Sequence, residues 1–255
     1  MTSVIGLATL VVAHRGGARL WPENSLMAFE NALALGVDGV ETDVHMTADG
    51  EIVVIHDPSL DRTTDRRGAI GGTRATDVTA ARLTDRSGRP TEERVPTLAQ
   101  LLDLLAPGRA RLLLEIKVDA RGRPYAGVEE KALALLRGRG MLERTLVMAF
   151  EAETVQRVRE LDATVRTVLL VGRRRDARDA VRRATALRAS AIGYAFRLLD
   201  VDLAAATRAA GLTVAAWTVN DEPAIRRVIG VGVDAVITDR PDLALRVVGQ
   251  RPPLR

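Results

Sequence analysis

The chain has 255 residues, 47% of them hydrophobic and 27% charged, a composition typical of a folded protein with a substantial core. Its 37 basic and 33 acidic residues give a net charge of only +4, so the charge balance does not indicate a nucleic-acid partner. The absence of cysteine excludes disulfides, thiolate metal sites and a cysteine nucleophile. No apolar run reaches the roughly 18 residues of a membrane span, so no membrane anchor is predicted.

Two local stretches bear on location and partners. Residues 4–12 are apolar, but no basic residue precedes them and no clear cleavage site follows, so we expect a buried strand and a cytoplasmic protein. The densest basic patch is Arg173-Arg174-Arg175 with Arg178, Arg182 and Arg183. No aromatic residues are interleaved for base stacking, so this patch is interpreted as a solvated face. The residues leave the oligomeric state open.

Short apolar runs alternate with helical patterns along the chain, and this order is typical of βα units around a parallel sheet. The predicted strands are 8–13, 39–44, 52–55, 112–118, 145–150, 165–171, 191–196, 214–219 and 235–238. The predicted helices are 25–35, 98–105, 128–137, 153–161, 176–187, 201–210, 222–229 and 242–248.

The length and the βα order favour an α/β fold, a (β/α)₈ TIM barrel. Nine strands are predicted where eight are needed, and 191–196 is interpreted as a short extra segment. The alternative is an open doubly wound sheet, but no glycine-rich nucleotide-binding loop supports it. No linker-like composition divides the chain, so we predict a single domain over residues 1–255.

Two segments depart from the simple plan. Only Thr47-Ala48-Asp49-Gly50 separates the second and third predicted strands, which is too short for a crossover helix. The two strands are joined either as a hairpin or by an extended segment that leads back down the barrel. Residues 58–94 show little periodicity, and so long a segment after the third strand suggests a lid or a small insertion over the site.

Acidic side chains near the ends of apolar strands give the strongest functional signal. Glu41 and Asp43 are two residues apart, so they share one face of a strand, and Glu115 and Lys117 repeat this spacing. Carboxylates buried side by side repel unless a cation or a proton lies between them. Their convergence at the barrel mouth favours a divalent metal site over structural salt bridges to Lys117 or Arg15. Oxygen ligands suit Mg²⁺ or Ca²⁺, and also Mn²⁺.

Two of the three histidines follow apolar strands directly. His14 and His56 stand where a general acid and a general base would reach a substrate at the mouth. His45 is assigned a turn or surface role. The planar guanidinium of Arg15 is suited to hydrogen-bonding a phosphate, and Lys117 offers a second positive charge. Three acids, two bases and two cations indicate the hydrolysis of a phosphate ester.

The motifs that contain these residues resemble the glycerophosphodiester phosphodiesterase family. They run in family order along nearly the whole chain: His14-Arg15-Gly16-Gly17, Pro22-Glu23-Asn24-Ser25, Gly36 to Val44, Thr47 to Gly50, Val53 to Asp57, Leu60-Asp61-Arg62-Thr63-Thr64, Glu115-Ile116-Lys117, Trp217-Thr218-Val219-Asn220 and Val236 to Pro241. The resemblance implies a TIM barrel with an insertion after the third strand, roughly residues 58–94.

The resemblance also implies roles for individual residues. It makes His14 and His56 the acid–base pair, and Arg15 and Lys117 the phosphate-binding residues. The metal ligands are then Glu41, Asp43 and Glu115. Trp217 is implied to help wall the pocket, with a core tryptophan as the alternative.

The expected activity is hydrolysis of small glycerophosphodiesters, such as glycerophosphocholine or glycerophosphoethanolamine, to sn-glycerol 3-phosphate and an alcohol. One divalent cation is the expected cofactor. Hydrolysis of lysophospholipids is the first alternative, although the chain has only seven aromatic residues to build an apolar groove. The second alternative is a binding protein on a retired catalytic scaffold, but none of the expected histidines or carboxylates is missing.

Overall fold

Eight parallel strands close into a barrel within the residues that the computed structural model describes, 9–177 and 179–249. In barrel order they are β1 (Leu10–His14), β2 (Gly39–Met46), β6 (Arg111–Ile116), β7 (Thr145–Ala149), β8 (Arg166–Val171), β9 (Ala191–Ala195), β10 (Thr213–Trp217) and β11 (Ala235–Thr238). The barrel closes because β1 pairs in parallel with both β11 and β2. The predicted (β/α)₈ TIM barrel is confirmed.

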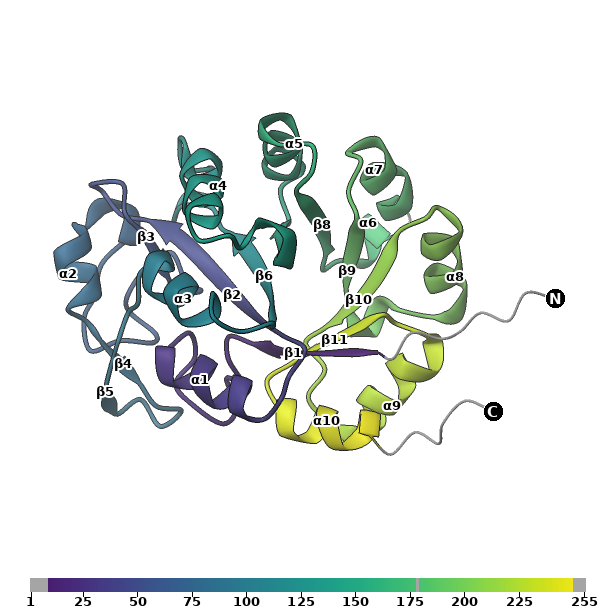
Figure 1. The fold of residues 1–255 in the computed structure, drawn as a ribbon, viewed down its shortest axis with the longest axis horizontal. Coiled ribbons are helices and arrows are strands. Elements are labelled where there is room, and N and C mark those ends of the chain that lie inside the picture. Colours follow the sequence, from purple (N-terminus) through teal and green to yellow (C-terminus); the bar gives the residue numbers. More distant parts are fainter. Residues whose placement is uncertain (1–8, 178, 250–255) are drawn as a thin grey trace.

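Helices follow the strands and form the outer layer of the barrel (Figure 1). They are α1 (Leu26–Ala34), α3 (Leu98–Leu105), α4 (Val128–Gly138), α5 (Ala152–Leu161), α6 (Arg174–Ala177), α7 (Ala180–Ala186), α8 (Val201–Ala209), α9 (Glu222–Val231) and α10 (Pro241–Gly249). The single helix predicted over 176–187 corresponds to the two helices α6 and α7, and Arg178 lies outside the described residues. Ala8, the first residue of the first predicted strand, also lies outside them.

Side-chain caps begin several of the helices. Ser25 accepts a hydrogen bond from Ala28 N at the start of α1, and Asp221 does the same for Ala224 N at the start of α9. Thr97 and Gln100 form a reciprocal capping box on α3. These caps satisfy backbone groups that have no partner inside the helix, and so they fix where each helix begins.

The strands are buried on both faces. Outward side chains such as Val11 and Ala13 pack against the helices, whereas inward side chains such as Val12, Leu113 and Met148 fill the barrel. Because side chains alternate along a strand, His14 continues the inward face of Val12, and Glu115 continues that of Leu113. The polar site is therefore at the carboxyl-terminal end of the strands, and the rest of the barrel interior is apolar.

One of the nine predicted strands, 52–55, lies outside the barrel. β3 (Ile52–Val54) pairs antiparallel with the end of β2, and Gly50 makes the tight turn between them at φ 81°. The link over 47–50 is therefore a hairpin, one of the two alternatives.

The interpretation of 191–196 as an extra segment was wrong. β9 pairs in parallel with β8 and with β10, so it is a full member of the barrel. A short apolar run can form either kind of strand, and only its pairing partners decide between them.

The segment after β3 folds as a small unit beside the barrel. It contains α2 (Ala75–Thr79) and an antiparallel pair, β4 (Arg82–Thr84) and β5 (Pro90–Arg94). Its core is formed by Val53, Ile55, Leu60, Ile70, Val78, Ala81, Leu83 and Val95. It lies next to α1 in Figure 1, and Met27 N donates to Glu93 there. The predicted insertion is thus an ordered structure.

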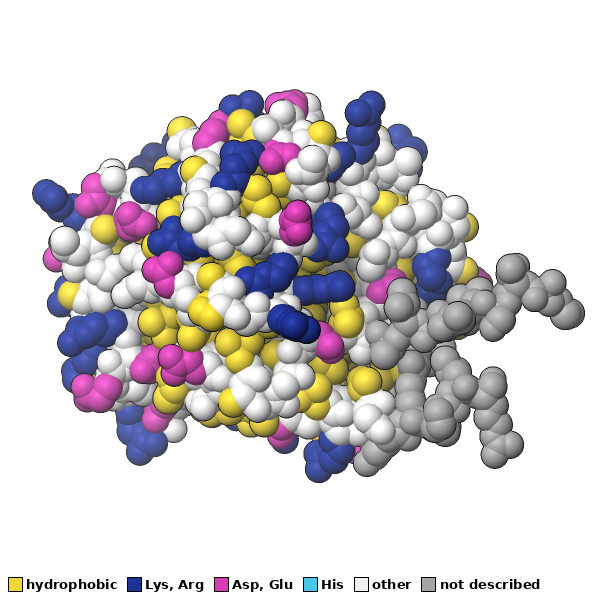
Figure 2. All heavy atoms as spheres, viewed as in Figure 1, with side chains coloured by type: hydrophobic (Ala, Val, Ile, Leu, Met, Phe, Trp, Pro, Cys, Tyr) yellow, Lys and Arg dark blue, Asp and Glu magenta, His cyan; other side chains and the backbone are white. Residues whose placement is uncertain are grey.

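Charged side chains of both signs are interspersed over the face of the molecule in Figure 2. Among the described residues, no helix combines the length and apolar character needed to cross a membrane.

Candidate active site

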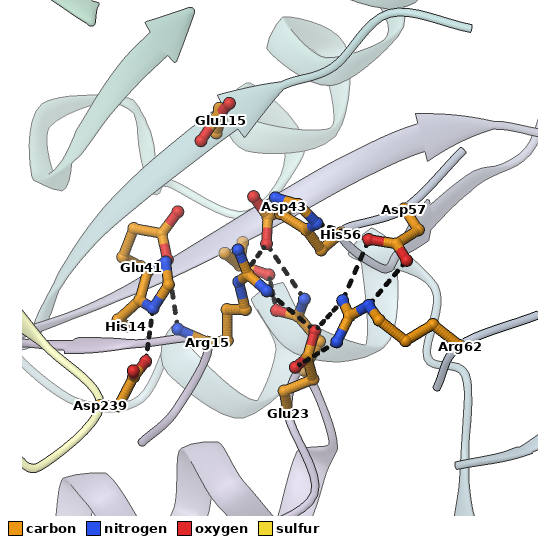
Figure 3. Close-up of polar contacts among 12 residues, drawn as sticks. His14, Arg15, Glu23, Glu41, Asp43, His56, Asp57, Arg62, Glu115 and Asp239 are labelled. Carbon is orange, nitrogen blue, oxygen red and sulfur yellow. Dashed lines mark hydrogen bonds and ion pairs between the residues drawn. The ribbon is translucent and has the colours of Figure 1, made fainter. Parts of the chain in front are cut away.

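Three buried carboxylates meet at the carboxyl end of the barrel. Glu41 and Asp43 project from β2 and Glu115 from its neighbour β6, where Asp43 is the register partner of Glu115. One oxygen from each lies within 4.8 Å of the others, and the three residues are 1%, 0% and 7% exposed. This is the cluster predicted from the two-residue spacing (Figure 3).

Two cations lie against the cluster. Lys117 Nζ is 2.5 Å from Glu115 Oε1 and 3.0 Å from Asp43 Oδ1, and Arg15 Nε is 3.1 Å from Asp43 Oδ2. Burial alone would raise the pKa of Asp43, but Lys117 and Arg15 outweigh it and hold this pKa well below its usual range. Burial and the Asp43 charge raise the pKa of Glu41, and burial raises that of Glu115 to about 7.

The cluster has the features of a divalent cation site. Asp43 Oδ1 is buried without a hydrogen-bond partner, although Lys117 is close. Three carboxylates face the two cations Lys117 and Arg15, so negative charge is in excess; burial and, after it, the Asp43 charge raise the pKa values of Glu41 and Glu115. A dication would remove that excess, and an all-oxygen set suits a hard ion such as Mg²⁺ or Ca²⁺. Glu41, Asp43 and Glu115 therefore fit a metal.

A tight turn after β1 sets the positions of His14 and Arg15. Arg15 has φ 52° and donates its backbone N–H to Glu41, both to the carbonyl oxygen (3.0 Å) and to Oε2 (3.1 Å). Gly16 follows at φ 79°, and a Cβ there would lie 2.8 Å from that of Ala28. Only glycine allows the turn to pack this closely on α1.

His14 forms a dyad with an aspartate that directly follows the last barrel strand, β11. Its Nδ1 lies 2.6 Å from Asp239 Oδ1, and Asn220 donates to Asp239 Oδ2 at 2.6 Å. Since an ionised carboxylate only accepts, a hydrogen is assigned to Nδ1, which leaves Nε2 as the nitrogen available for proton transfer. His14 Nε2 is 3.9 Å from Glu41 Oε2, so it faces the acidic cluster.

His56 forms a second dyad with the same geometry. Its Nδ1 is 2.6 Å from Asp57 Oδ1, and Arg62 donates to the same carboxylate. Burial lowers the pKa of His56, which favours the neutral ring at neutral pH. Both predicted histidines therefore have an aspartate on Nδ1.

The turn or surface role assigned to His45 was wrong. This residue is 1% exposed on β2, and its ring contacts Tyr125 Oη and the His56 carbonyl oxygen, each at 2.9 Å. Burial lowers its pKa to about 4. His45 extends the strand past the barrel edge, where β3 and the following segment cover it, and this covering cannot be read from its position in sequence.

These groups surround one cavity of about 140 Å³. Its polar wall is formed by His14, Arg15, Glu41, His56, Glu115 and Lys117, with Asp43 directly behind Lys117. Its apolar wall contains Trp217 and Phe150, whose rings meet edge to face at 5.5 Å. Trp217 Nε1 donates to Gly193 O at 2.9 Å, which fixes the indole plane. The structure brings all eight predicted site residues together.

The residues that orient the site were given no role from sequence. They are Glu23, Asn24, Asp57, Arg62, Asn220 and Asp239. Each lies within a motif quoted above, so a polar residue inside a motif was the available signal. What each one contacts depends on the fold.

A closed (β/α)₈ barrel with acids, cations and paired histidines at the carboxyl ends of its strands defines a TIM-barrel enzyme. The chain belongs to the glycerophosphoryl diester phosphodiesterase family, whose family model matches residues 14–243. The chain is 29% identical over 243 residues to a glycerophosphodiester phosphodiesterase of Caldanaerobacter subterraneus subsp. tengcongensis, covering 95% of this chain and 98% of the relative. It is 30% identical to one from Bacillus altitudinis, covering 94% and 98%.

Solved structures of similar proteins agree with membership of this family. A glycerophosphodiester phosphodiesterase from Agrobacterium tumefaciens str. C58 superposes with a TM-score of 0.79 at 29% identity, covering 93% of this chain and 99% of that one. A phosphodiesterase from Oleispira antarctica, in complex with the product sn-glycerol-3-phosphate, superposes with a TM-score of 0.82 at 26% identity, covering 95% and 98%.

Proposed function

We propose that this chain hydrolyses small glycerophosphodiesters, such as glycerophosphocholine or glycerophosphoethanolamine, to sn-glycerol 3-phosphate and an alcohol, with a divalent cation bound. One observation carries the proposal. Two histidines, each with an aspartate on Nδ1 at 2.6 Å, flank the three-carboxylate cluster in one cavity. This arrangement offers two free Nε2 atoms beside a cation site. The product-bound Oleispira antarctica phosphodiesterase supports the choice of substrate class.

Glu41, Asp43 and Glu115 would hold the cation. When bound, it supplies Lewis-acid stabilisation of the negative charge that builds on the phosphoryl oxygens. The identity of this ion, Mg²⁺, Ca²⁺ or Mn²⁺, is to be decided by titrating the metal-free protein with each.

Lys117 and Arg15 supply fixed positive charge to the same oxygens. Burial lowers the pKa of Lys117, but Asp43 and Glu115 outweigh burial and raise it above its usual range, so Lys117 stays charged at neutral pH. Trp217 and Phe150 give the glycerol carbons an apolar wall.

The two histidines divide the proton transfers. One, as the neutral ring, takes the proton of the attacking hydroxyl on Nε2 as that oxygen bonds to phosphorus. The other enters the step as the imidazolium, protonated on both ring nitrogens, and gives its Nε2 proton to the alcohol oxygen as the bond from phosphorus to that oxygen breaks. The attacking oxygen is that of water or the substrate's own glycerol 2-hydroxyl. Rapid-quench trapping of a 1,2-cyclic glycerophosphate supports the second route, and its absence supports the first.

The test is hydrolysis of glycerophosphocholine with Mg²⁺, Ca²⁺ or EDTA, with glycerol 3-phosphate detected by a coupled dehydrogenase. A His14→Ala, His56→Ala double variant is assayed beside a Glu160→Gln control on the exposed face of α5. Metal-dependent turnover that only the double variant loses supports the proposal. Equal turnover in all three proteins contradicts the assigned residues. Faster turnover of lysophosphatidylcholine moves the substrate to lysophospholipids, and metal binding without any turnover indicates a retired scaffold.

We propose further that the whole chain acts as one domain. The pairing of β1 with β11 supports this, since strands from both ends of the described chain belong to one sheet. A cytoplasmic location stays a prediction, which cell fractionation checks.

A further inference from the structure

Arg62 connects the inserted segment to two neighbouring segments of the active site, the one after β1 and the one after β3. Its guanidinium donates from Nε to Asp57 Oδ2 at 2.7 Å and from Nη1 to Glu23 Oε2 at 3.0 Å. Nη2 donates to both carboxylates, at 3.0 Å to Asp57 Oδ1 and 2.8 Å to Glu23 Oε1. All three nitrogens of this one side chain are used, and both contacts are bidentate (Figure 3).

Each of these carboxylates also holds one of the proposed functional residues. Asp57 Oδ1 lies 2.6 Å from His56 Nδ1, so it sets the orientation of that ring. Glu23 Oε1 accepts from Arg15 Nη1 at 2.9 Å, and Arg15 comes from the turn after β1, the strand that neighbours β2 in the barrel. Arg62 therefore reaches His56 through Asp57, and Arg15 through Glu23.

The inserted segment fixes the backbone around Arg62. Leu60 is 1% exposed in the core of this segment, and its N–H donates to Gly68 O at 3.0 Å. Thr64 donates from Oγ1 back to Leu60 O at 2.8 Å, which closes the turn that contains Arg62. The guanidinium thus projects from a rigid turn.

We propose that Arg62 is a positioning residue that holds His56 and Arg15 in a fixed relation to one another at the barrel mouth. The proposal rests on the proposed function, in which His56 transfers a proton and Arg15 binds the phosphate. A planar fork that bonds two carboxylates at once is available to arginine and not to lysine. The inserted segment then contributes to turnover without contacting the reacting atoms.

The exposure of Arg62 separates this role from a role in stability. Its side chain is 47% exposed, and ion pairs at such sites contribute little to folding because water screens them. Misplacing a reacting group by about 1 Å costs on the order of 100-fold in rate. Loss of Arg62 should therefore lower turnover much more than stability.

The experiment compares Arg62→Gln with a matched control, Arg82→Gln. Arg82 lies in the same segment with a side chain 44% exposed, and it donates from Nε to Asp65 Oδ2 at 2.9 Å, away from the barrel mouth. We expect Arg62→Gln to lower kcat/KM about 10- to 100-fold, with kcat reduced and KM raised. Arg82→Gln should stay within about threefold of the wild type. Equal losses in the two variants overturn the proposal.

A second readout does not need turnover. The chain has three histidines, so their ring nitrogens can be followed individually by ¹⁵N NMR. In Arg62→Gln the His56 nitrogens should move toward tautomer-averaged shifts, whereas those of His14, held by Asp239, should stay unchanged. Unchanged His56 shifts overturn the proposal. If the wild type does not hydrolyse glycerophosphodiesters, the proposed function fails separately, and these spectra alone decide the role of Arg62.

Arg62→Lys covers the case in which Arg62→Gln does not fold. It keeps the charge but loses the two-carboxylate fork, so kcat/KM should fall at least about tenfold. Wild-type turnover in Arg62→Lys overturns the proposal.

Discussion

Replacing Glu115 by glutamine should stabilise the metal-free protein. Its carboxylate lies within 4.8 Å of oxygens of Glu41 and Asp43. Two like charges at 4.8 Å repel by about 3 kcal/mol at an effective dielectric constant of about 20. Burial and Asp43 raise the Glu115 pKa from 4.5 to about 7 despite Lys117, which also corresponds to about 3 kcal/mol.

The size of this stabilisation depends on pH. Because the folded-state pKa of Glu115 is raised, its ionisation destabilises the folded protein. This destabilisation is absent below pH 4.5, grows as the pH rises, and is complete above about pH 7. The amide should cost roughly 1 kcal/mol through a weaker contact with Lys117, which leaves a gain of about 2 kcal/mol at pH 8. For a chain of this length that gain raises Tm by about 4–8 °C.

The assay is thermal unfolding in EDTA at pH 5 and pH 8. Glu115→Gln is compared with the wild type and with Glu160→Gln, whose side chain is 52% exposed on α5. The control should change stability by less than about 0.5 kcal/mol at either pH. A Tm gain that is absent at pH 8, or as large at pH 5 as at pH 8, refutes the reasoning. Adding Mg²⁺ or Ca²⁺ should reverse the order, because a bound ion stabilises only the protein that binds it.

Two further predictions concern the residue that orients His14 and a residue of the apolar pocket wall. Asp239→Asn should lower kcat on the order of 100-fold or more, because an amide in place of the carboxylate acceptor allows the wrong His14 tautomer. Steady-state kinetics checks this prediction. A kcat within twofold of wild type would contradict the role of the His14–Asp239 dyad. Trp217→Phe removes the hydrogen bond to Gly193 O and should cost about 1 kcal/mol of stability. Denaturant unfolding measures that loss of stability. The KM for glycerophosphocholine should rise in the same variant, and an unchanged KM would argue against Trp217 as a wall of the substrate pocket.

The sequence by itself determined the parts of this protein that depend on local pattern. The alternation of apolar strands and amphipathic helices was enough to predict the barrel, because these periodicities are local properties of the chain. The spacing of Glu41 and Asp43 placed two acids on one strand face, and the position of Glu115 at a strand end placed a third near them. Motif order identified the family.

The tertiary structure decided what depends on distant pairing. The run at 191–196 and the run at 52–55 look alike as sequence, yet β9 pairs on both edges within the barrel while β3 pairs only with the end of β2 among the barrel strands. His14 and Asp239 are 225 positions apart and meet only because β1 and β11 close the barrel. Such a contact has no local periodicity, so only the closed fold determines that Asp239 orients His14, whereas the acid that orients His56 is its sequence neighbour Asp57.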